Sequence, residues 1–299
     1  MLDYPEEDFL SSALCAYRMR TGLYSTPTLC RDWQFGTMGD GRASFHLIGE
    51  GDCWVHMRGI GGPIHLVAGD LFMFPHDDWH LISGASTLRG TENRMTMGTE
   101  IPFTSVICGY VEFIAGRMNP ILSALPPFIL IRGIDALPSV DSLSKLLLLE
   151  TKNYAIGTRC VIDKLVDALF VMVLRQHLLT LKEPTGLLGA LIDVRIRRAL
   201  DAIHREPSRQ WTVELLAETA TMSKSAFAVR FAELMGTKPK EYVTRWRMTQ
   251  AELMLKDPVT TVAHAARSNG YESEAAFRRA FKRLFGIGPR KARLKGKFD

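Results

Sequence analysis

The sequence predicts an α+β protein with an all-β N-terminal part, a helical middle segment and an all-α C-terminal part. Three observations indicate this order. Short apolar runs separated by Gly and Asp occupy residues 44–83, a helical period replaces them over 138–181, and a seven-residue pattern in the last third recurs at an offset of fifty. The chain has 299 residues, 46% of them hydrophobic, so it is long enough to bury two cores.

The N-terminal part has the strand and turn pattern of a small β-barrel or sandwich. Short runs rich in β-branched and aromatic side chains end at turns that contain Gly or Asp. The expected strands are Ser44–Gly49, Cys53–Met57, Ile64–Val67, Leu71–Pro75 and Thr104–Phe113, with an exit segment at Leu125–Ile131. Closely spaced short strands of this kind predict a barrel or sandwich in one domain.

Several histidines lie in or beside these strands, namely His46, His56, His65, His76 and His80. Imidazole is the commonest metal ligand in proteins, so His46, His76 and His80 are candidate ligands of a divalent metal. Cys53 or Cys108 could join them as a further donor. The alternative is that these histidines are packed or surface residues.

The middle of the chain takes the helical period. Val161, Leu165, Leu169 and Val173 share one face of an expected helix within residues 136–181. Residues 182–192 contain Pro184 and Gly186 and are expected to form a linker.

The C-terminal part contains a duplicated helix. Each copy has Ser where an N-cap belongs, a Phe-x-x-x-Phe-x-x-Leu stripe, and Gly then Pro where the helix should end. The copies are Ser223, Ala226, Phe227, Phe231, Leu234, Gly236, Pro239 and Ser273, Ala276, Phe277, Phe281, Leu284, Gly286, Pro289.

A short Ala-rich amphipathic segment precedes each copy. These segments are Val213–Ala220 and Thr260–Arg267, and a helical pattern at Lys240–Lys256 joins the two pairs. A helix, a tight turn and a second helix form a helix-turn-helix, whose second helix enters the major groove of DNA. The sequence therefore predicts two of these motifs in tandem.

The net charge of the chain changes sign between the N-terminal residues 1–192 and the C-terminal residues 193–299. Residues 193–299 carry 22 Lys and Arg against 12 Asp and Glu, a net +10, and residues 1–192 carry 15 against 20, a net −5. The basic half suits a polyanionic partner, although a solvated basic surface would give the same count.

The remaining composition indicates a protein that stays in the cytoplasm. Five scattered cysteines without a C-x-x-C pair are typical of a reduced protein. The acidic first ten residues are unlike a signal peptide, and the longest apolar run, Leu165–Leu174, is too short to span a membrane. We therefore expect no membrane partner.

Residues 193–299 resemble the DNA-binding domain of the AraC/XylS family of bacterial transcription regulators. The matching residues include Trp211-Thr-Val, Met222-Ser-x-Ser-x-Phe, Gly236-x-x-Pro-x-x-Tyr242, Gly270-Tyr-x-Ser-Glu-Ala-Ala-Phe-x-Arg-Ala-Phe-Lys282 and Phe285-Gly-x-x-Pro289. This long ordered run implies a sequence-specific DNA-binding protein, with RNA polymerase as a further candidate partner.

Residues 69–80 resemble the second cupin motif, Gly, five residues, Pro and then His. Asp77 stands where that motif usually has Gly, and Ile48 stands where the first motif of cupin enzymes has a second His. The resemblance implies a cupin-like β-barrel sensor domain over 1–135, a helical dimerisation segment over 136–181, a linker over 182–192 and the DNA-binding domain over 193–299. Packing of the helices on their own barrel is the alternative to dimerisation.

The two expected recognition helices present unequal outward faces. Arg279, at the centre of the second face, can donate two hydrogen bonds to guanine, and Glu274 can accept from cytosine or orient an arginine. Many relatives carry Arg where Val229 stands, so we expect the first helix to read DNA shape and thymine methyl groups. The base-contact candidates are Ser225, Ala228, Val229, Glu274, Ala275, Arg278 and Arg279.

Other basic residues around these helices are candidates for phosphate contacts, which fix register without reading sequence. They are Lys224, Arg230, Lys238, Lys282, Arg283, Arg290 and Lys291. A solvated charge is the alternative for each.

The leading hypothesis is a homodimeric transcription regulator that responds to a small-molecule effector in the barrel and has no catalytic residues. One alternative is a metal-dependent cupin enzyme fused to a DNA-binding domain. Another is a constitutive DNA-binding protein whose barrel serves only for dimerisation.

Overall fold

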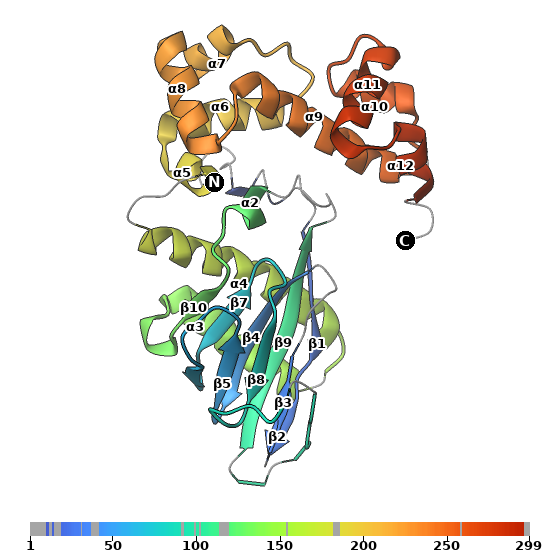
Figure 1. The fold of residues 1–299 in the computed structure, drawn as a ribbon. Helices are drawn as coiled ribbons and strands as arrows, with labels where there is room; N and C mark the ends of the chain where they lie inside the picture. Colours follow the sequence, from blue (N-terminus) through green and yellow to red (C-terminus); the bar gives the residue numbers. More distant parts are fainter. Residues whose placement is uncertain are drawn as a thin grey trace. The chain divides into compact units, whose positions relative to one another are not determined.

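The computed structural model describes residues 10–11, 14, 19–30, 32–36, 42–90, 93–98, 100–101, 103–113, 120–153, 155–181, 186–257 and 259–295. The chain forms two compact units (Figure 1). The sandwich unit contains Met19–Glu112 and Leu125–Leu181, and the helical unit contains Met1–Arg18, Phe113–Ala124 and Lys182–Asp299.

The sandwich unit is built on two antiparallel sheets. The first has the order β1-β9-β4-β7-β10, with β2 paired to β9, and the second has the order β3-β8-β5-β6. The strands are β1 Met19–Ser25, β2 Thr28–Cys30, β3 Gln34–Phe35, β4 Ala43–Glu50, β5 Asp52–Met57, β6 Ile64–Val67, β7 Leu71–Phe74, β8 His80–Ser83, β9 Phe103–Phe113 and β10 Ile129–Ile131.

The two sheets form a sandwich rather than the closed barrel that the sequence analysis favoured. Among the described residues, no strand of one sheet pairs with a strand of the other. The core between them is made by alternate residues of facing strands, such as Phe72 and Phe74 from the first sheet and Cys53 and Val55 from the second. Each of these side chains is completely buried. Period-2 alternation therefore places one face of each sheet in a common core.

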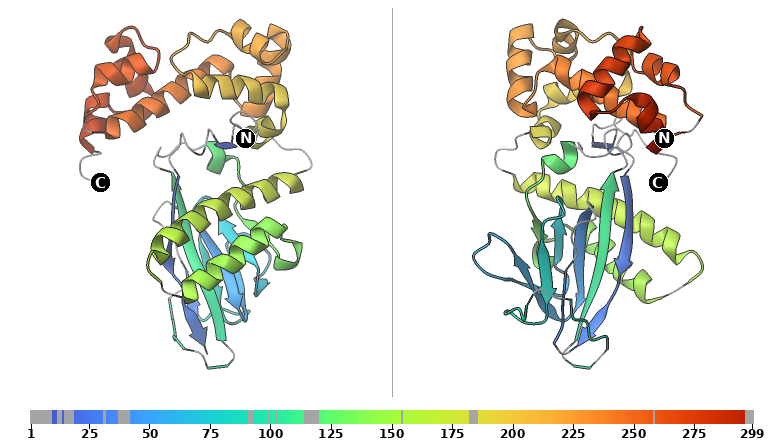
Figure 2. Two further views of the ribbon diagram at one scale, coloured as in Figure 1. Left: turned by 180° about the vertical axis from the view of Figure 1, so that it is seen from behind. Right: turned by 45° about the vertical axis from the view of Figure 1, so that its right-hand side comes forward.

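Two helices cover the outer face of the first sheet, α3 (Pro138–Lys152) and α4 (Thr158–Thr180), as Figure 2 shows from behind. Leu169 and Val173 of α4 face Phe45 and Val111 of the sheet, and the Thr21 hydroxyl in β1 donates to the Asp167 carboxylate at 2.7 Å. The apolar stripe of α4 thus packs on the sheet of its own chain, and these helices join the compact unit of the strands.

The helical unit contains a chain of short helices. These are α2 Pro120–Ser123, α5 Gly186–Ile192, α6 Val194–Arg205, α7 Val213–Thr219, α8 Lys224–Met235, α9 Pro239–Lys256, α10 Val262–Ser268, α11 Glu274–Phe285 and α12 Pro289–Lys295. Residues 186–192, within the expected linker, are therefore helical. None of the helices in the described ranges is long and apolar enough to cross a membrane.

The duplicated helix of the sequence is confirmed in α8 and α11. The hydroxyls of Ser223 and Ser273 cap these helices by accepting from the third backbone N–H that follows. Gly236 and Gly286 end them in the left-handed region, with φ of 62° and 71°. The paired Phe residues of each copy are completely buried. Because each signal is local, the sequence fixes where these helices start and stop.

Candidate nucleic-acid interface and buried histidine pair

The outward face of α11 is basic. Phe277 and Phe281 hold the opposite face in the core, which leaves Arg279 exposed at the centre of the outward face. Ala275, Lys282 and Arg283 are exposed beside it. Arg279 forms no ion pair with any residue that the structure describes, so its guanidinium is available to a ligand.

Arg278 differs from Arg279 because it forms an ion pair with Glu274. Arg278 Nε donates to Glu274 Oε1 at 2.8 Å, and Nη2 donates to the same oxygen. Both side chains are half-buried on the flank of α11. Of the two roles that the sequence offered for Glu274, this contact corresponds to the orientation of an arginine.

The outward face of α8 has no comparable donor. Ser225 is exposed, Ala228 is half-buried, and Val229 is 60% exposed at the centre. An aliphatic side chain at that position can contact a thymine methyl group but cannot donate to a base.

Two of the phosphate candidates are bound to carboxylates. Lys224 forms an ion pair with Glu214, and the hydrogen bond from Lys224 lowers the pKa of Glu214 to about 2. Arg230 Nε donates to Asp193 at 2.9 Å, while the same aspartate caps α6 by accepting from two backbone N–H groups. Arg230 therefore fastens α8 to the start of α6, and a phosphate contact at Arg230 stays a prediction.

The other phosphate candidates are exposed and form no ion pair within the described part of the chain. They are Lys238, Lys282, Arg283, Arg290 and Lys291. A surface of this charge attracts the phosphates of duplex DNA.

A second cluster of polar side chains lies inside the sandwich. His46 in β4 and His80 in β8 approach from opposite sheets, with 2.9 Å between their Nε2 atoms. His46 Nδ1 lies 3.3 Å from the sulfur of Cys108 in β9, and His80 Nδ1 lies 2.8 Å from the Asp78 carbonyl oxygen. All three side chains are at most 1% exposed.

These contacts assign the ring protons. A carbonyl oxygen only accepts, so His80 Nδ1 carries its proton and neutral His80 accepts at Nε2. His46 must then donate from Nε2 and accept at Nδ1 from the Cys108 thiol. Burial lowers the pKa of His80 to about 4 and that of His46 well below its usual value. Both rings are therefore neutral at pH 7, and the cluster is a directed chain of hydrogen bonds.

The three-histidine metal site suggested by the sequence does not form. His76 Nε2 lies 2.9 Å from the Leu125 carbonyl oxygen, so this ring nitrogen is engaged by the backbone. Cys108 contacts the edge of His46 opposite to His80, so the three cannot share one ion. Among the described residues, no three His, Cys, Asp or Glu side chains converge on a point that could hold a metal.

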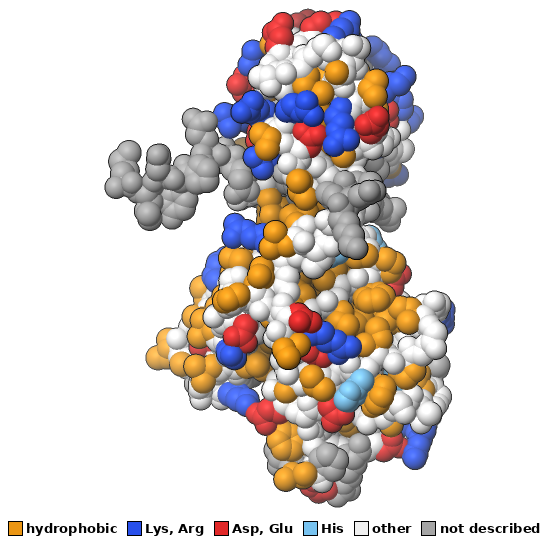
Figure 3. All heavy atoms as spheres, turned by 90° about the vertical axis from the view of Figure 1, so that its left-hand side faces the viewer, with side chains coloured by type: hydrophobic (Ala, Val, Ile, Leu, Met, Phe, Trp, Pro, Cys, Tyr) orange, Lys and Arg blue, Asp and Glu red, His pale blue; other side chains and the backbone are white. Residues whose placement is uncertain are grey.

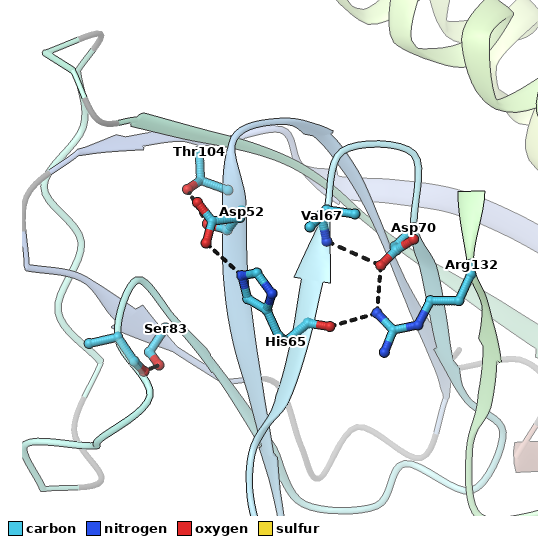
Figure 4. A network of polar contacts seen from close by, with 8 residues as sticks. Asp52, His65, Val67, Asp70, Ser83, Thr104 and Arg132 are labelled. Atoms are coloured by element: carbon cyan, nitrogen blue, oxygen red, sulfur yellow. Dashed lines mark hydrogen bonds and ion pairs between the residues drawn. The ribbon is translucent and has the colours of Figure 1, made fainter. Parts of the chain in front are cut away.

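A further network closes one edge of the sandwich, and the sequence analysis did not single it out (Figure 4). Asp70, in the turn between β6 and β7, is 1% exposed. Its carboxylate accepts from Arg132 at 2.8 Å and from the backbone of Val67 and Gly133. Arg132 also donates to the His65 carbonyl at 2.6 Å. Since His65 is in β6 and Arg132 follows β10, this pair links the edge strands of the two sheets.

Most of the chain is similar in sequence to known proteins and protein families. Residues 8–179 match the cupin family, and residues 216–295 match a helix-turn-helix domain family. An uncharacterized HTH-type transcriptional regulator of Haemophilus influenzae is 30% identical over 260 residues, which cover 83% of this chain and 85% of that protein. The HTH-type transcriptional regulator AlkR of Acinetobacter baylyi is 28% identical over 276 residues, which cover 87% and 90%.

Among solved structures, the DNA-binding domain of AdpA in complex with a target DNA is 30% identical. It covers 32% of this chain and 87% of that chain, with a TM-score of 0.32.

A cupin domain followed by paired helix-turn-helix motifs defines a DNA-binding transcription regulator. The chain belongs to the AraC/XylS family of transcriptional regulators, in the group with an N-terminal cupin domain.

Proposed function

We propose that this regulator reads its operator unequally through its two helix-turn-helix motifs. In this proposal α11 supplies hydrogen bonds to bases through Arg279, and α8 reads groove shape and methyl groups through Ser225, Ala228 and Val229. The observation that supports it most directly is the exposed Arg279 side chain, which forms no ion pair with the described residues, set against the apolar centre of α8.

The test is genome-wide binding with the wild type and Arg279→Ala. A lost bidentate contact to guanine removes about 1–3 kcal/mol of discrimination, so the variant is expected to lose specific sites while its affinity for bulk DNA changes little. An equal loss of affinity for specific sites and for bulk DNA would make Arg279 a phosphate contact and refute its role in base reading.

We also propose that the cupin domain binds a small-molecule effector and that the protein acts without catalysis. Membership of a family of regulators supports both statements. The proposed domains remain a sensor over 1–135, a helical segment over 136–181, a linker over 182–192 and a DNA-binding domain over 193–299. Thermal unfolding across a panel of metabolites tests the effector, since a ligand of the folded state raises the unfolding temperature.

A homodimer through the helical segment is part of the same proposal. Leu146 and Leu149 lie three residues apart on α3 and are 44% and 56% exposed, and Val161 and Leu179 of α4 are 42% and 75% exposed. Exposed apolar side chains are also visible on the sandwich unit in Figure 3. Exposed apolar side chains on both of these helices support an interface with a second copy. RNA polymerase is a further proposed partner, which in vitro transcription from a bound promoter would test.

A further inference from the structure

A basic groove lies beside the second recognition helix. It has a volume of about 590 Å³ and three walls. Thr261 and Val262 at the start of α10 form one wall, Glu274 and Arg278 of α11 form the second, and Arg290 and Arg293 of α12 form the third. Glu274, Arg278 and Arg290 were separate DNA-contact candidates in the sequence, and the fold brings them together at this groove.

The charge of the groove suits an anion. Three arginines and one glutamate line it, which leaves two positive charges in excess. Glu274 binds Arg278 through Nε and Nη2, so it fixes the plane of that guanidinium while leaving Nη1 free of this contact. Arg290 is exposed and has no ion pair with the residues that the structure describes. Guanidinium groups match the oxygens of a phosphate with two parallel donors.

The position of the groove indicates which anion it receives. Successive residues of a helix are separated by about 100°, so Arg278 lies to one side of the Arg279 face and Glu274 lies further round. When α11 lies in the major groove with Arg279 toward the bases, its flank meets a sugar–phosphate strand that borders that groove. An acidic protein segment would match the charge as well, but it would not explain the position next to the base-reading face.

We propose that this groove clamps backbone phosphates of the operator through Arg278, Arg290 and Arg293. The inference rests on the proposed placement of α11 in the major groove. It moves Arg278 from the base-contact candidates to the phosphate contacts, and it adds Arg293, which the sequence analysis did not select.

The test uses the full chain with Arg290→Gln and Arg293→Gln, singly and together. Affinity is measured by fluorescence anisotropy on a promoter fragment and on a scrambled fragment of equal length, over a series of salt concentrations. Each phosphate contact contributes about 0.9 to the slope of log affinity against log salt, so the double variant should lose about 2 from that slope. At physiological salt its affinity should fall on the order of 10-fold on both fragments.

Arg267→Gln is the matched control, because Arg267 is exposed on α10 but does not line the groove. It should leave the slope within 0.5 or so of the wild type. Circular dichroism and thermal unfolding confirm that each variant is folded.

Three results would overturn the clamp. Unchanged affinity and slope in a folded double variant would show that the groove binds no phosphate. Loss on the promoter alone would make these residues base contacts. Unchanged DNA binding with lost transcription would identify an acidic protein segment as the occupant. If the wild type binds neither fragment at low salt, the DNA-binding function itself fails, which is a separate outcome.

Discussion

Two adjacent arginines of α11 are held in different ways. Arg278 is bound to Glu274 four residues earlier on the same helix, whereas Arg279 has no ion pair among the described residues. A solvent-accessible pair of this spacing contributes only about 0.3–0.5 kcal/mol to the free energy of unfolding, so its effect on stability is small. The ion pair has a larger effect on orientation. It directs the Arg278 guanidinium along the flank of α11, whereas the Arg279 guanidinium remains free to contact a base.

The buried histidines illustrate which site residues a sequence can identify. His46 and His80 were candidate ligands of one metal, and the structure brings their rings together from opposite sheets. His76 was expected to join them, but its ring is held by the Leu125 carbonyl, 49 residues away in the chain. The Asp193–Arg230 pair is similar, since its members are 37 residues apart. Long-range partners of this kind leave no local pattern in the sequence.

The histidine pair predicts an acid-sensitive sandwich. Burial holds the pKa of His80 near 4, below its ordinary 6.5, so well above pH 6.5 neither the folded nor the unfolded state binds a proton there. Between pH 6.5 and 4 the unfolded chain binds a proton that the folded chain does not, and stability falls as pH falls. From pH 7.5 to 5.0 this one residue should cost about 2 kcal/mol. Urea unfolding at the two pH values measures the loss.

The variant His80→Phe should reduce that pH-dependent loss, because phenylalanine cannot be protonated and can keep the stacking on Phe74, whose ring centre lies 3.6 Å from that of His80. His65→Asn is the control, since His65 is on the surface of β6 with 44% of its side chain exposed. An unchanged pH dependence in His80→Phe would show that the acid sensitivity arises elsewhere.

At the scale of elements, local signals were sufficient for α8 and α11. They were insufficient for α5, which forms within the expected linker, and for the closure of the sheets. The Ser caps and Gly stops of α8 and α11 act within a few residues, so their positions could be predicted from the sequence. Whether two sheets close into a barrel depends on pairing between edge strands that are distant in the chain. In the same way, the apolar stripe of α4 predicted a buried face but not the sheet that covers it.

The unequal recognition helices predict a gain of function. Val229→Arg places a guanidinium at the exposed centre of α8, where it can donate to guanine. We expect the preferred base at one operator position to change toward guanine, with discrimination of about 1–3 kcal/mol. Selection of binding sites from a randomised operator library measures the change.

Val259→Arg provides the matched control for this substitution. Val259 is 83% exposed between α9 and α10, so the same charge is added to the same unit outside the recognition face. It should raise affinity for all sequences without a new preference. If Val229→Arg behaves in the same way, α8 does not contact bases at this position.

At the scale of the whole molecule, the exposed leucines of α3 predict the oligomeric state. In a two-fold interface each substitution acts on both copies. Burial of one leucine contributes about 1.5–3 kcal/mol, so Leu149→Glu should weaken the dimer on the order of 100-fold or more. Sedimentation equilibrium measures the dissociation constant of the dimer. Ile134→Glu is the control, because Ile134 is 94% exposed and lies outside the α3 and α4 helices. A monomeric wild type would contradict the prediction.

The route from the cupin domain to DNA is predicted to pass through the segment that connects β9 to β10. Its helix α2 (Pro120–Ser123) belongs to the helical unit, whereas Met19–Glu112 and Leu125–Leu181 belong to the sandwich unit. Helix α2 contacts α5, and α5 packs on α8. A Cβ atom added to Gly186 in α5 would lie 3.8 Å from the Ala124 side chain and 4.0 Å from the Leu234 carbonyl. Helix α2 is thus packed, through α5, against the first recognition helix.

Ile121→Ala tests this route, because Ile121 of α2 is 1% exposed. Truncation of a buried isoleucine costs about 2–5 kcal/mol locally, so amide hydrogen exchange should accelerate in α5 and α8 while α10 and α11 keep their protection. Val140→Ala in α3, an equally buried residue of the sandwich, should leave exchange in α8 unchanged. Equal acceleration in α8 and α11 would mean that the helical unit responds as one body, and a conformational signal from the cupin domain would then have no preferred entry at the first helix-turn-helix.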